Sequence, residues 1–421
     1  MRPSGIEIIV FPFHDWRKCE QQGLRRRDTS VVLGLANHPA VSRVLVVDRP
    51  LALPHLLFDA MRGRSWRLRQ GELVRKDSFS ALTKVSEKLY VLDLIVPDIV
   101  QSLLLRRGWW PHVLQQELVA RKTRAAARWL GMANPMLWLF TPISAPLIGR
   151  ASESLVVFDA IDDWMSHSGM GPYRESAARG YETIRQRADV IFCVSENLAE
   201  SLGGGRADPF WIPNGVDASL FTPDGPLAAD VLELPSPRVG YVGAIERRVD
   251  IELLTEVVSA LPSASFVFVG PYDRRLVAPV KKLPNAYFLG ARRFEEMPAY
   301  LRAMDVCIMP HRVNAFTSSM NPLKLYEYLA CGRPVVSTPV AGTESFRGLI
   351  EIARTPNEFV ACITKAMQSV GPDEIAARRR AVEAQSWQSR VNQMMNIVVQ
   401  AQQRKNASRE PAAPNYERMK A

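Results

Sequence analysis

The chain has 421 residues, a length that predicts two or three domains of ordinary size. It is 47% hydrophobic and 23% charged, as globular proteins are, which excludes a coiled coil, a collagen-like chain and an intrinsically disordered chain. Its formal net charge of +10 allows three classes of partner: nucleic acid, an anionic membrane surface or an acidic small substrate.

The cysteines and histidines predict neither a disulfide framework nor a metal site. The 5 cysteines lack C-x-x-C spacing, and the 6 histidines form no H-E-x-x-H motif. The N-terminus has no signal-peptide pattern, and the longest uncharged stretch, 132–149, contains three prolines, which disfavours a membrane-spanning helix. We therefore expect a cytoplasmic protein that touches the inner face of the plasma membrane only peripherally, if at all.

Short apolar runs recur along the first half, each followed by a polar turn and a helical pattern. Such uninterrupted runs predict strands buried on both faces, and their alternation with helices predicts a parallel sheet. The runs lie at residues 6–11, 43–47, 89–92, 136–140, 155–158 and 190–194.

After a turn at 212–217 the same series starts again. The second set of runs lies at residues 238–243, 266–270, 286–290, 306–310 and 334–338. Two successive series predict an α/β protein of two Rossmann-like domains, 1–217 and 218–385, whose parallel sheets face a cleft and bind ligands beyond the carboxyl ends of their strands. A last helix is predicted over 386–402, and residues 403–421 read as a disordered tail.

One helix of the second half has the features of a phosphate site. Asn321 is a favourable N-cap, Pro322 suits the first helical position, and Gly332 ends the helix. Free backbone N–H groups at such a helix start bind phosphate, next to a loop that holds Ser318 and Ser319.

Lys324 and Glu327 are three residues apart and share one face of this helix. The lysine can neutralise a diphosphate, and the glutamate can accept two hydrogen bonds from a ribose. The alternative is an ordinary capped amphipathic helix with a surface Lys–Glu pair.

This arrangement resembles the nucleotide-sugar site of GT-B-fold glycosyltransferases in the group numbered family four. There a Glu-x7-Glu pattern precedes a Gly-x-Pro-Val-Val strand, and Glu327 matches the second glutamate, which holds the donor ribose. The first glutamate, which lies near the transferred sugar, is replaced by Ser319. The glycine loop of the family matches Gly243, and because Ala244 stands where the family often has arginine, Arg247 or Arg248 is expected to supply the charge.

The first half resembles the transferases of teichuronic acid and related bacterial polysaccharides at residues 158–164, 188–190, 194–195 and 213–217. The resemblance implies a GT-B fold whose last helix crosses back to the first domain. It also implies a metal-independent, hexosyltransferase-type enzyme with no bound cofactor. Its co-substrate would be a UDP- or GDP-sugar, and its acceptor a glycan or a polyprenyl-diphosphate-linked glycan. None of these motifs specifies a particular sugar.

Two loops of the first half hold candidates for the base that deprotonates the acceptor. Asp162 and Asp163 follow the predicted strand 155–158, together with Asp159, and His14 and Asp15 follow the strand 6–11. Both loops should line the cleft, where a carboxylate or an imidazole can take a hydroxyl proton. The alternatives are helix capping for the aspartates and an ordinary loop for His14.

Several aromatic and basic residues allow more than one role. Trp16 can stack on a sugar or belong to the core. The arginines of the run 25–28, those between 62 and 76, and the pair Trp109–Trp110 suit an anionic lipid surface, although charge runs are usually solvated faces.

Two other functions compete with the glycosyltransferase. A nucleotide-sugar epimerase of the same architecture would need acid and base carboxylates around the sugar. A nucleic-acid-binding protein, a function of another class, would fit the positive charge but has no recognisable motif. A dinucleotide oxidoreductase is disfavoured because no Gly-x-Gly-x-x-Gly follows a first strand.

Overall fold

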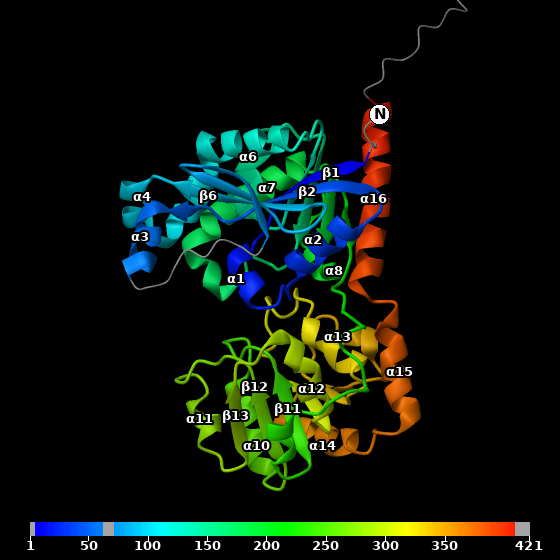
Figure 1. Cartoon of the computed structure of the whole chain (residues 1–421). Helices are drawn as coiled ribbons and strands as arrows, with labels where there is room; N and C mark the ends of the chain where they lie inside the picture. The colour runs from blue at the N-terminus through cyan, green and yellow to red at the C-terminus, as the bar shows by residue number, and fades with distance from the viewer. Residues whose placement is uncertain (1–4, 62–70, 409–421) are drawn as a thin grey trace, which may run out of the picture.

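The structure is a computed structural model, and it describes residues 5–61 and 71–408. Two sheets, each flanked by helices, lie one above the other in Figure 1 and meet at a junction of loops. The runs that the sequence predicts as strands all fall on strands of these sheets.

The first sheet has the strand order β10-β9-β8-β7-β1-β2-β6-β5-β4, with β3 paired to β6 beside this path. Its strands are β1 (Ile6–Phe11), β2 (Val41–Val47), β3 (Leu51–Ala52), β4 (Glu72–Asp77), β5 (Ser80–Lys84), β6 (Leu89–Val96), β7 (Met136–Leu139), β8 (Leu155–Ala160), β9 (Val190–Cys193) and β10 (Pro209–Trp211). β7 separates β1 from β8, so the loops after β1 and β8 emerge close together at one edge of the sheet.

The first sheet is parallel, as the sequence predicts, except at one edge. β5 pairs antiparallel with both β6 and β4. Short turns cause both pairings. Between β4 and β5 the Asp77 carboxylate accepts hydrogen bonds from the Phe79 N–H and the Ser80 hydroxyl, and between β5 and β6 the Leu89 carbonyl accepts one from the Val85 N–H. A hairpin of this kind joins neighbouring strands without the helical crossover that parallel strands need.

Helices cover both faces of the first sheet. They are α1 (Trp16–Gln21), α2 (Arg27–Asn37), α3 (Leu53–Met61), α4 (Ile99–Leu105), α5 (Trp109–Gln115), α6 (Glu117–Trp129), α7 (Arg174–Arg187) and α8 (Glu196–Leu202). Short 3-10 helices lie at η1 (Arg106–Gly108), η2 (Pro142–Leu147) and η3 (Ser168–Tyr173).

The second sheet is parallel throughout, with the order β13-β12-β11-β14-β15-β16. Its strands are β11 (Arg238–Val242), β12 (Ser265–Val269), β13 (Ala286–Gly290), β14 (Val306–Met309), β15 (Val335–Ser337) and β16 (Glu351–Ile352). The helices around it are α9 (Ala229–Leu232), α10 (Ile251–Ala260), α11 (Ala278–Lys281), α12 (Met297–Arg302), α13 (Leu323–Ala330), α14 (Pro356–Ala366) and α15 (Pro372–Glu383).

The last helix, α16 (Trp387–Ala407), returns to the first sheet. Its buried Val391, Met394 and Met395 belong to the core of the first half, and the helix runs along the upper half in Figure 1. The helix continues to Ala407, so the predicted tail begins too early, and residues 409–421 lie outside the described part of the chain.

We propose the division of the chain into domains at residues 217 and 218. The buried core around the first sheet takes residues up to Ile212 and resumes with Val391, whereas a core of the second half begins at Val216. In residues 5–61 and 71–408, no helix is both long enough and apolar enough to cross a membrane.

Candidate active site at the domain junction

Helix α13 starts one residue later than the sequence predicts. Pro322 is its N-cap, and the helix begins at Leu323. Asn321 is therefore not the cap: its side-chain Oδ1 accepts a hydrogen bond of 2.9 Å from the backbone N–H of Asn214, and its carbonyl accepts one of 2.6 Å from the Asn214 side chain. The Asn321 side chain therefore links the two halves of the protein. As a result, the first N–H groups of α13 have no capping side chain.

Lys324 points from α13 onto the first strand of the second sheet. Its Nζ donates a hydrogen bond to the Tyr241 hydroxyl and lies 3.9 Å from the centre of the Tyr241 ring. Gly243 has a φ of +138°, a backbone conformation that favours glycine, and a Cβ there would lie 3.0 Å from the Lys324 Nζ. Burial, and then the nearby Arg248, lowers the pKa of Lys324 well below its ordinary value.

The loop after β11 contributes a second cation, and it is Arg248. This side chain acts electrostatically on Lys324 and on Asp162, and it pairs with Glu246 at 3.2 Å. Arg247 is instead exposed. It lines a pocket of about 400 Å³ beyond the ends of β11 and β12, together with Ala244, Ile245, Glu246, Pro271, Tyr272, Asp273 and Leu276.

His311, at the end of β14, is a residue that the sequence analysis did not single out. It is buried, and within the described part of the chain neither ring nitrogen has a hydrogen-bond partner. Burial lowers the pKa of His311 well below its ordinary value, and Lys324 and Arg248 lower it further. The ring is therefore a neutral polar group next to the two cations, and only the fold, not a motif, brings it there.

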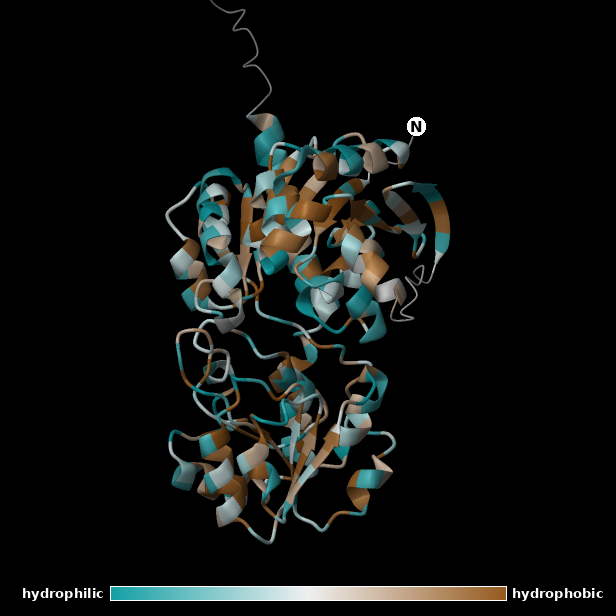
Figure 2. Cartoon of the chain, turned by 90° about the vertical axis from the view of Figure 1, so that its left-hand side faces the viewer, coloured by the Kyte–Doolittle hydropathy of each residue, from teal (hydrophilic) through white to brown (hydrophobic). Residues whose placement is uncertain are grey.

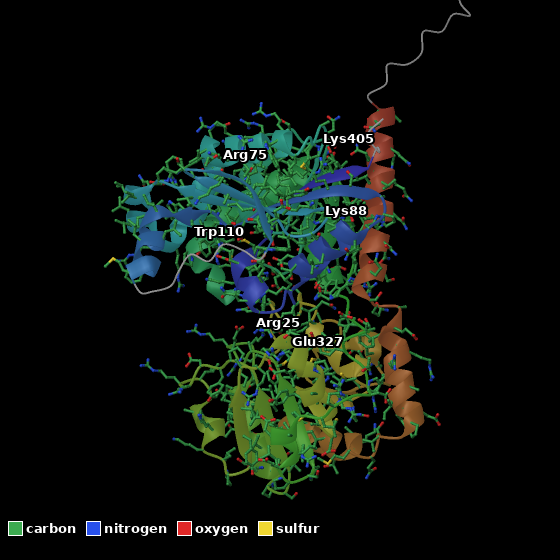
Figure 3. All side chains as sticks on the ribbon, in the orientation of Figure 1. Arg25, Arg75, Lys88, Trp110, Glu327 and Lys405 are labelled. Carbon is green, nitrogen blue, oxygen red and sulfur yellow. The ribbon has the colours of Figure 1, made fainter. Side chains whose placement is uncertain are left out.

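Glu327 lies one turn further along α13 and is half-buried at the junction. Burial raises the pKa of Glu327 to about 7, against the lowering effects of Lys324 and of Arg25 from the other half. Figure 3 labels Arg25 and Glu327 on opposite sides of this junction. A carboxylate in this position can accept hydrogen bonds from hydroxyl groups of a ligand held between the halves.

The loop before α13 is fixed to the first half through its backbone. The carbonyl of Ser319 accepts a hydrogen bond of 2.7 Å from the Ser195 hydroxyl, and the carbonyl of Ser318 accepts one of 2.7 Å from the Asn197 side chain. Ser195 is also the N-cap of α8. These contacts hold the start of α13 against the carboxyl edge of the first sheet.

On the other side of the junction, His14 is paired with Asp28 and not with its neighbour Asp15. His14 Nδ1 lies 2.9 Å from the buried carboxylate of Asp28, which also accepts the His14 backbone N–H at 2.9 Å. Burial alone would raise the pKa of Asp28, but the contacts with His14 hold it below its ordinary value. An ionised Asp28 places the proton on Nδ1, so Nε2 is left as the acceptor, 3.3 Å from the guanidinium of Arg26.

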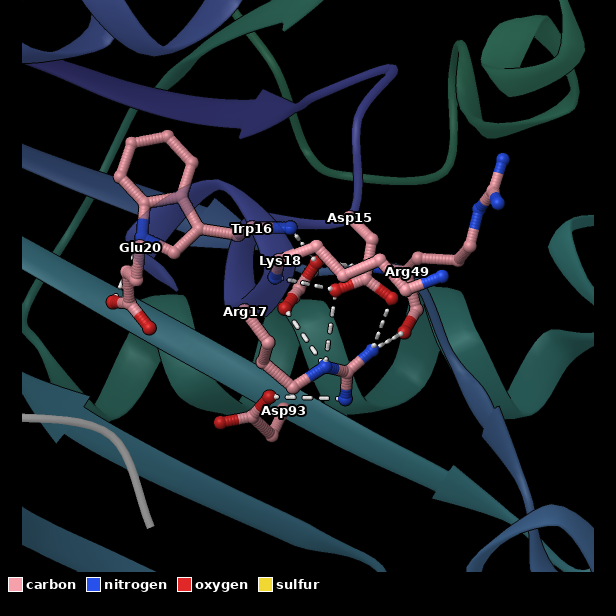
Figure 4. Close-up of polar contacts among 8 residues, drawn as sticks. Asp15, Trp16, Arg17, Lys18, Glu20, Arg49 and Asp93 are labelled. Atoms are coloured by element: carbon pink, nitrogen blue, oxygen red, sulfur yellow. Dashed lines mark hydrogen bonds and ion pairs between the residues drawn. The ribbon is translucent and has the colours of Figure 1, made fainter. Parts of the chain in front are cut away.

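Asp15 is occupied by a structural cluster. It caps α1 and pairs with Arg17, whose guanidinium also contacts Asp48 and Asp93 (Figure 4). Trp16 is completely buried, and its Nε1 donates to Glu20 at 3.1 Å. The core alternative is therefore correct for Trp16, and Asp15 has no free carboxylate for an acceptor.

The three aspartates after β8 have three different environments. Asp159 is fully buried and pairs with Arg27 at 2.9 Å. Asp163 accepts hydrogen bonds from the N–H groups of Met165 and Ser166, which is a capping role. Both are thus held by structure.

Asp162 is the one of the three aspartates that is influenced by charged groups of both halves. Burial raises the pKa of Asp162 to about 6, against the lowering effects of Arg248, His14 and Arg26. Among the described residues, none donates a hydrogen bond to its carboxylate, although its backbone carbonyl accepts one from Tyr181. Its oxygens are available to a substrate.

The charge run at 25–28 forms much of the junction and is not a solvated face. Arg25 faces Glu327, Arg26 contacts His14, and Asp28 orients the same histidine. Arg27 contacts Asn214 at 3.2 Å, and thereby links the Asp159 pair to the junction. No local pattern marks these roles, because the partners are distant in sequence.

Comparisons with known proteins find one family and several relatives. Residues 236–369 match the profile of the family described as Glycosyl transferases group 1. A "Putative teichuronic acid biosynthesis glycosyltransferase TuaH" from Bacillus subtilis is 27% identical over 329 residues, which are 72% of this chain and 82% of that protein. A GDP-mannose-dependent mannosyltransferase from Corynebacterium glutamicum is 25% identical over 271 residues, 60% of this chain and 68% of that protein.

Solved structures show the same fold. HepE from Anabaena, in complex with UDP and glucose, has a TM-score of 0.60 at 15% identity, covering 94% of this chain and 99% of that one. A trehalose-6-phosphate synthase from Burkholderia multivorans has a TM-score of 0.65 at 11% identity, covering 96% of this chain and 100% of that one.

Proposed function

We propose that this chain, a glycosyltransferase of the family-four-like group with the GT-B fold, transfers a sugar from a nucleoside diphosphate sugar to a glycan or lipid-linked acceptor of a bacterial-type surface polysaccharide. The observation that carries the proposal is the convergence of Lys324, Arg248 and Glu327 at the carboxyl edge of the second sheet. That edge is where open α/β sheets bind nucleotides.

The donor diphosphate would lie between Lys324, Arg248 and the first N–H groups of α13. These groups are fixed in place, and they stabilise the negative charge that develops on the departing diphosphate without reorganising. Glu327 would accept hydrogen bonds from the ribose. The sequence predicts both Arg247 and Arg248 for the donor site, and we propose that Arg248 alone acts there, because Arg247 is exposed. The rest of the predicted set is kept, and Ser318, Ser319, Asn321 and Pro322 act by shaping the start of the helix.

The acceptor hydroxyl would approach Asp162 and His14 from the first half. With a pKa of about 6, Asp162 is ionised at neutral pH and close enough to it to act as a general base. The oriented His14 is the second candidate, and the test of Asp162 below includes it. Ser319 supplies no carboxylate near the sugar, so the base must come from this side or from the leaving diphosphate itself.

The comparisons favour a transferase over the two competing functions. The proteins and structures compared above are glycosyltransferases or sugar-phosphate synthases, so the epimerase alternative gains no support. The arginines of the run 25–28 make contacts inside the junction. They are therefore less available to a nucleic acid, and the nucleic-acid-binding alternative loses support.

We further propose that the protein acts on the cytoplasmic side of the plasma membrane as a peripheral protein. A lipid-linked acceptor would require it to work at that surface. A first test of the function is thermal stabilisation of the full chain by UDP, GDP and a mixed oligonucleotide. Stabilisation by a nucleoside diphosphate supports a transferase, whereas stabilisation by the oligonucleotide alone would contradict it.

A further inference from the structure

Helix α4 presents apolar side chains to solvent and a polar one to the protein. Val100, Leu103 and Leu104 are 65%, 60% and 71% exposed, whereas Ser102 is 2% exposed. Apolar side chains thus cover the solvent-facing side of this short helix, whereas an ordinary surface helix places polar side chains there.

A second helix extends the same apolar surface. α3 packs next to α4, and its Leu57 and Met61 are also exposed, Met61 by 86%. The two helices form the outermost edge of the first half in Figure 1, and Figure 2 looks onto this side of the molecule, where apolar ribbon lies among the helices that face the viewer. We call this surface the α3–α4 edge; its apolar members are Leu57, Phe58, Met61, Ile99, Val100, Leu103, Leu104 and Leu105.

The exposure of α4 is built into the fold. Asp98 caps the helix, and its carboxylate also accepts hydrogen bonds from Trp109 Nε1 at 3.2 Å and from Gln116 Nε2 at 2.9 Å. These bonds fasten α4 to α5, so the leucines are held outward rather than exposed by fraying.

Positive charge follows the apolar helix directly. Arg106 and Arg107 are exposed at its end. The tryptophans expected to dock on lipid, Trp109 and Trp110, are buried, so that expectation is wrong for them. The leucines that precede them are the exposed apolar residues.

The α3–α4 edge is linked to the acceptor side of the active site. Trp110, on α5, lies 5.8 Å from the ring of Phe13, the residue before His14. A partner bound at the α3–α4 edge would therefore lie near the loop after β1, which holds His14.

We propose that the α3–α4 edge docks on an anionic lipid bilayer, with its leucines in the boundary between headgroups and acyl chains and with Arg106 and Arg107 on lipid phosphates. The proposal rests on the proposed function in one respect, because a lipid-linked acceptor places the substrate at that surface. A bilayer can surround a protruding helix on all its outer sides, and anionic headgroups complement the two guanidinium groups. A second copy of the chain would meet the same arginines with like charge.

The test is flotation of the full chain with vesicles of phosphatidylcholine, with and without phosphatidylglycerol. We expect binding to the anionic vesicles. The double variant L103Q/L104Q should lower the partition constant about tenfold for each leucine, and R106Q/R107Q about fivefold for each arginine. A matched control is L227Q/L232Q, which changes two leucines of similar character in the second half, 46% and 44% exposed, and should bind as wild type.

Local protection gives a second readout. On adding anionic vesicles, amide hydrogen exchange should slow in residues 99–105 and stay unchanged in α10. Wild-type binding by L103Q/L104Q, or protection elsewhere only, would overturn the proposal. So would a lipid-free dimer that dissociates in this variant, because the edge would then be an interface between copies.

The outcome can be separated from that of the proposed function. Stabilisation by UDP or GDP should be the same for wild type and L103Q/L104Q, which also shows that the variant folds. Nucleotide binding without vesicle binding overturns the docking proposal alone, and vesicle binding without nucleotide binding overturns the proposed function alone.

Discussion

Glu327 illustrates how the junction sets the chemistry of single residues. Removal from water favours its neutral form, while Lys324 and Arg25 favour the carboxylate, and the balance raises the pKa to about 7. A ribose-binding carboxylate with this pKa changes charge near neutral pH. Its role can therefore be followed by titration as well as by mutation.

Replacing Glu327 by glutamine should weaken UDP or GDP binding by about 1.5–3 kcal/mol, because a charge-assisted contact is lost. Since the pKa is raised, the carboxylate is present above about pH 7 and protonated below it. Wild-type affinity should therefore fall as the pH is lowered through about 7, and the affinity of the variant should lack this step. Isothermal calorimetry measures both, and an unchanged affinity at high pH would show that the glutamate points elsewhere.

Lys324→Met should weaken binding of UDP more than binding of UMP. The lysine acts by its charge on the distal phosphate, and the monophosphate lacks that group. Lys282→Met, which removes an exposed lysine of the second half, serves as the control and should leave both affinities unchanged. Equal losses for UDP and UMP would place Lys324 away from the distal phosphate.

Asp162→Asn should lower turnover by about 10²–10⁴-fold and leave donor affinity intact, as expected for the loss of a general base. With a pKa of about 6, the wild-type rate should rise with pH through about 6, and the variant should lose this limb. His14→Gln tests the alternative, and Asp163→Asn is the control for a capping aspartate.

If both Asp162→Asn and His14→Gln keep wild-type turnover, neither side chain acts as base. The leaving diphosphate would then take the proton by front-side displacement. NMR of the product anomer would show retained configuration in that case.

At the scale of elements, the sequence predicts the buried strands well but misses β3, β4, β5, β10 and β16, and it predicts the start of α13 less well. Runs such as 155–158 and 306–310 are buried on both faces, so their apolar character suffices to find β8 and β14. The sequence predicts the start of α13 one residue too early, because Asn321 makes its hydrogen bonds to Asn214, 107 residues away. A local capping rule has no access to such a partner.

The sequence predicts which loops form the candidate site, but not which side chains in those loops pair with one another. The order of strands places the loops after β1 and β8 at one edge, as expected. Which side chain is free depends on distant partners: Arg27 occupies Asp159, 132 residues away, and Asp28 replaces Asp15 beside His14. Such pairs can be identified only once the fold is known, because their members are distant in sequence.

The packing of α16 on α2 gives a prediction at this scale. A Cβ on Gly34 would come within 2.6 Å of Val391 Cγ2, so Gly34→Ala should lower the free energy of unfolding by about 1–3 kcal/mol through overpacking. Gly171→Ala is the control, because a Cβ there meets no atom within 4 Å. Chemical denaturation measures the effect.

A double variant isolates the contact. Gly34→Ala should cost less in the background of Val391→Ala, which removes the two methyl groups that the new Cβ meets. If the cost is the same in both backgrounds, α16 does not press on α2 at this point.

For the whole molecule, the two halves are joined by polar contacts at the place where the substrates would meet. Ser195, Asn197 and Asn214 of the first half bind backbone or side-chain groups just before α13. We propose that a donor held at this junction would be shielded from water, which would limit its hydrolysis. We propose that this junction activates a nucleotide sugar.

The most direct test is release of the nucleotide from a panel of UDP- and GDP-sugars, measured for the full chain and for Glu327→Ala. We predict that the wild type releases UDP or GDP from at least one donor, faster when a glycan or lipid-linked acceptor is present, and that the variant releases it much more slowly. Equal release by wild type and variant would contradict the assigned donor site. No release from any donor, combined with no binding of UDP or GDP, would contradict the assignment of the junction as a glycosyltransferase active site.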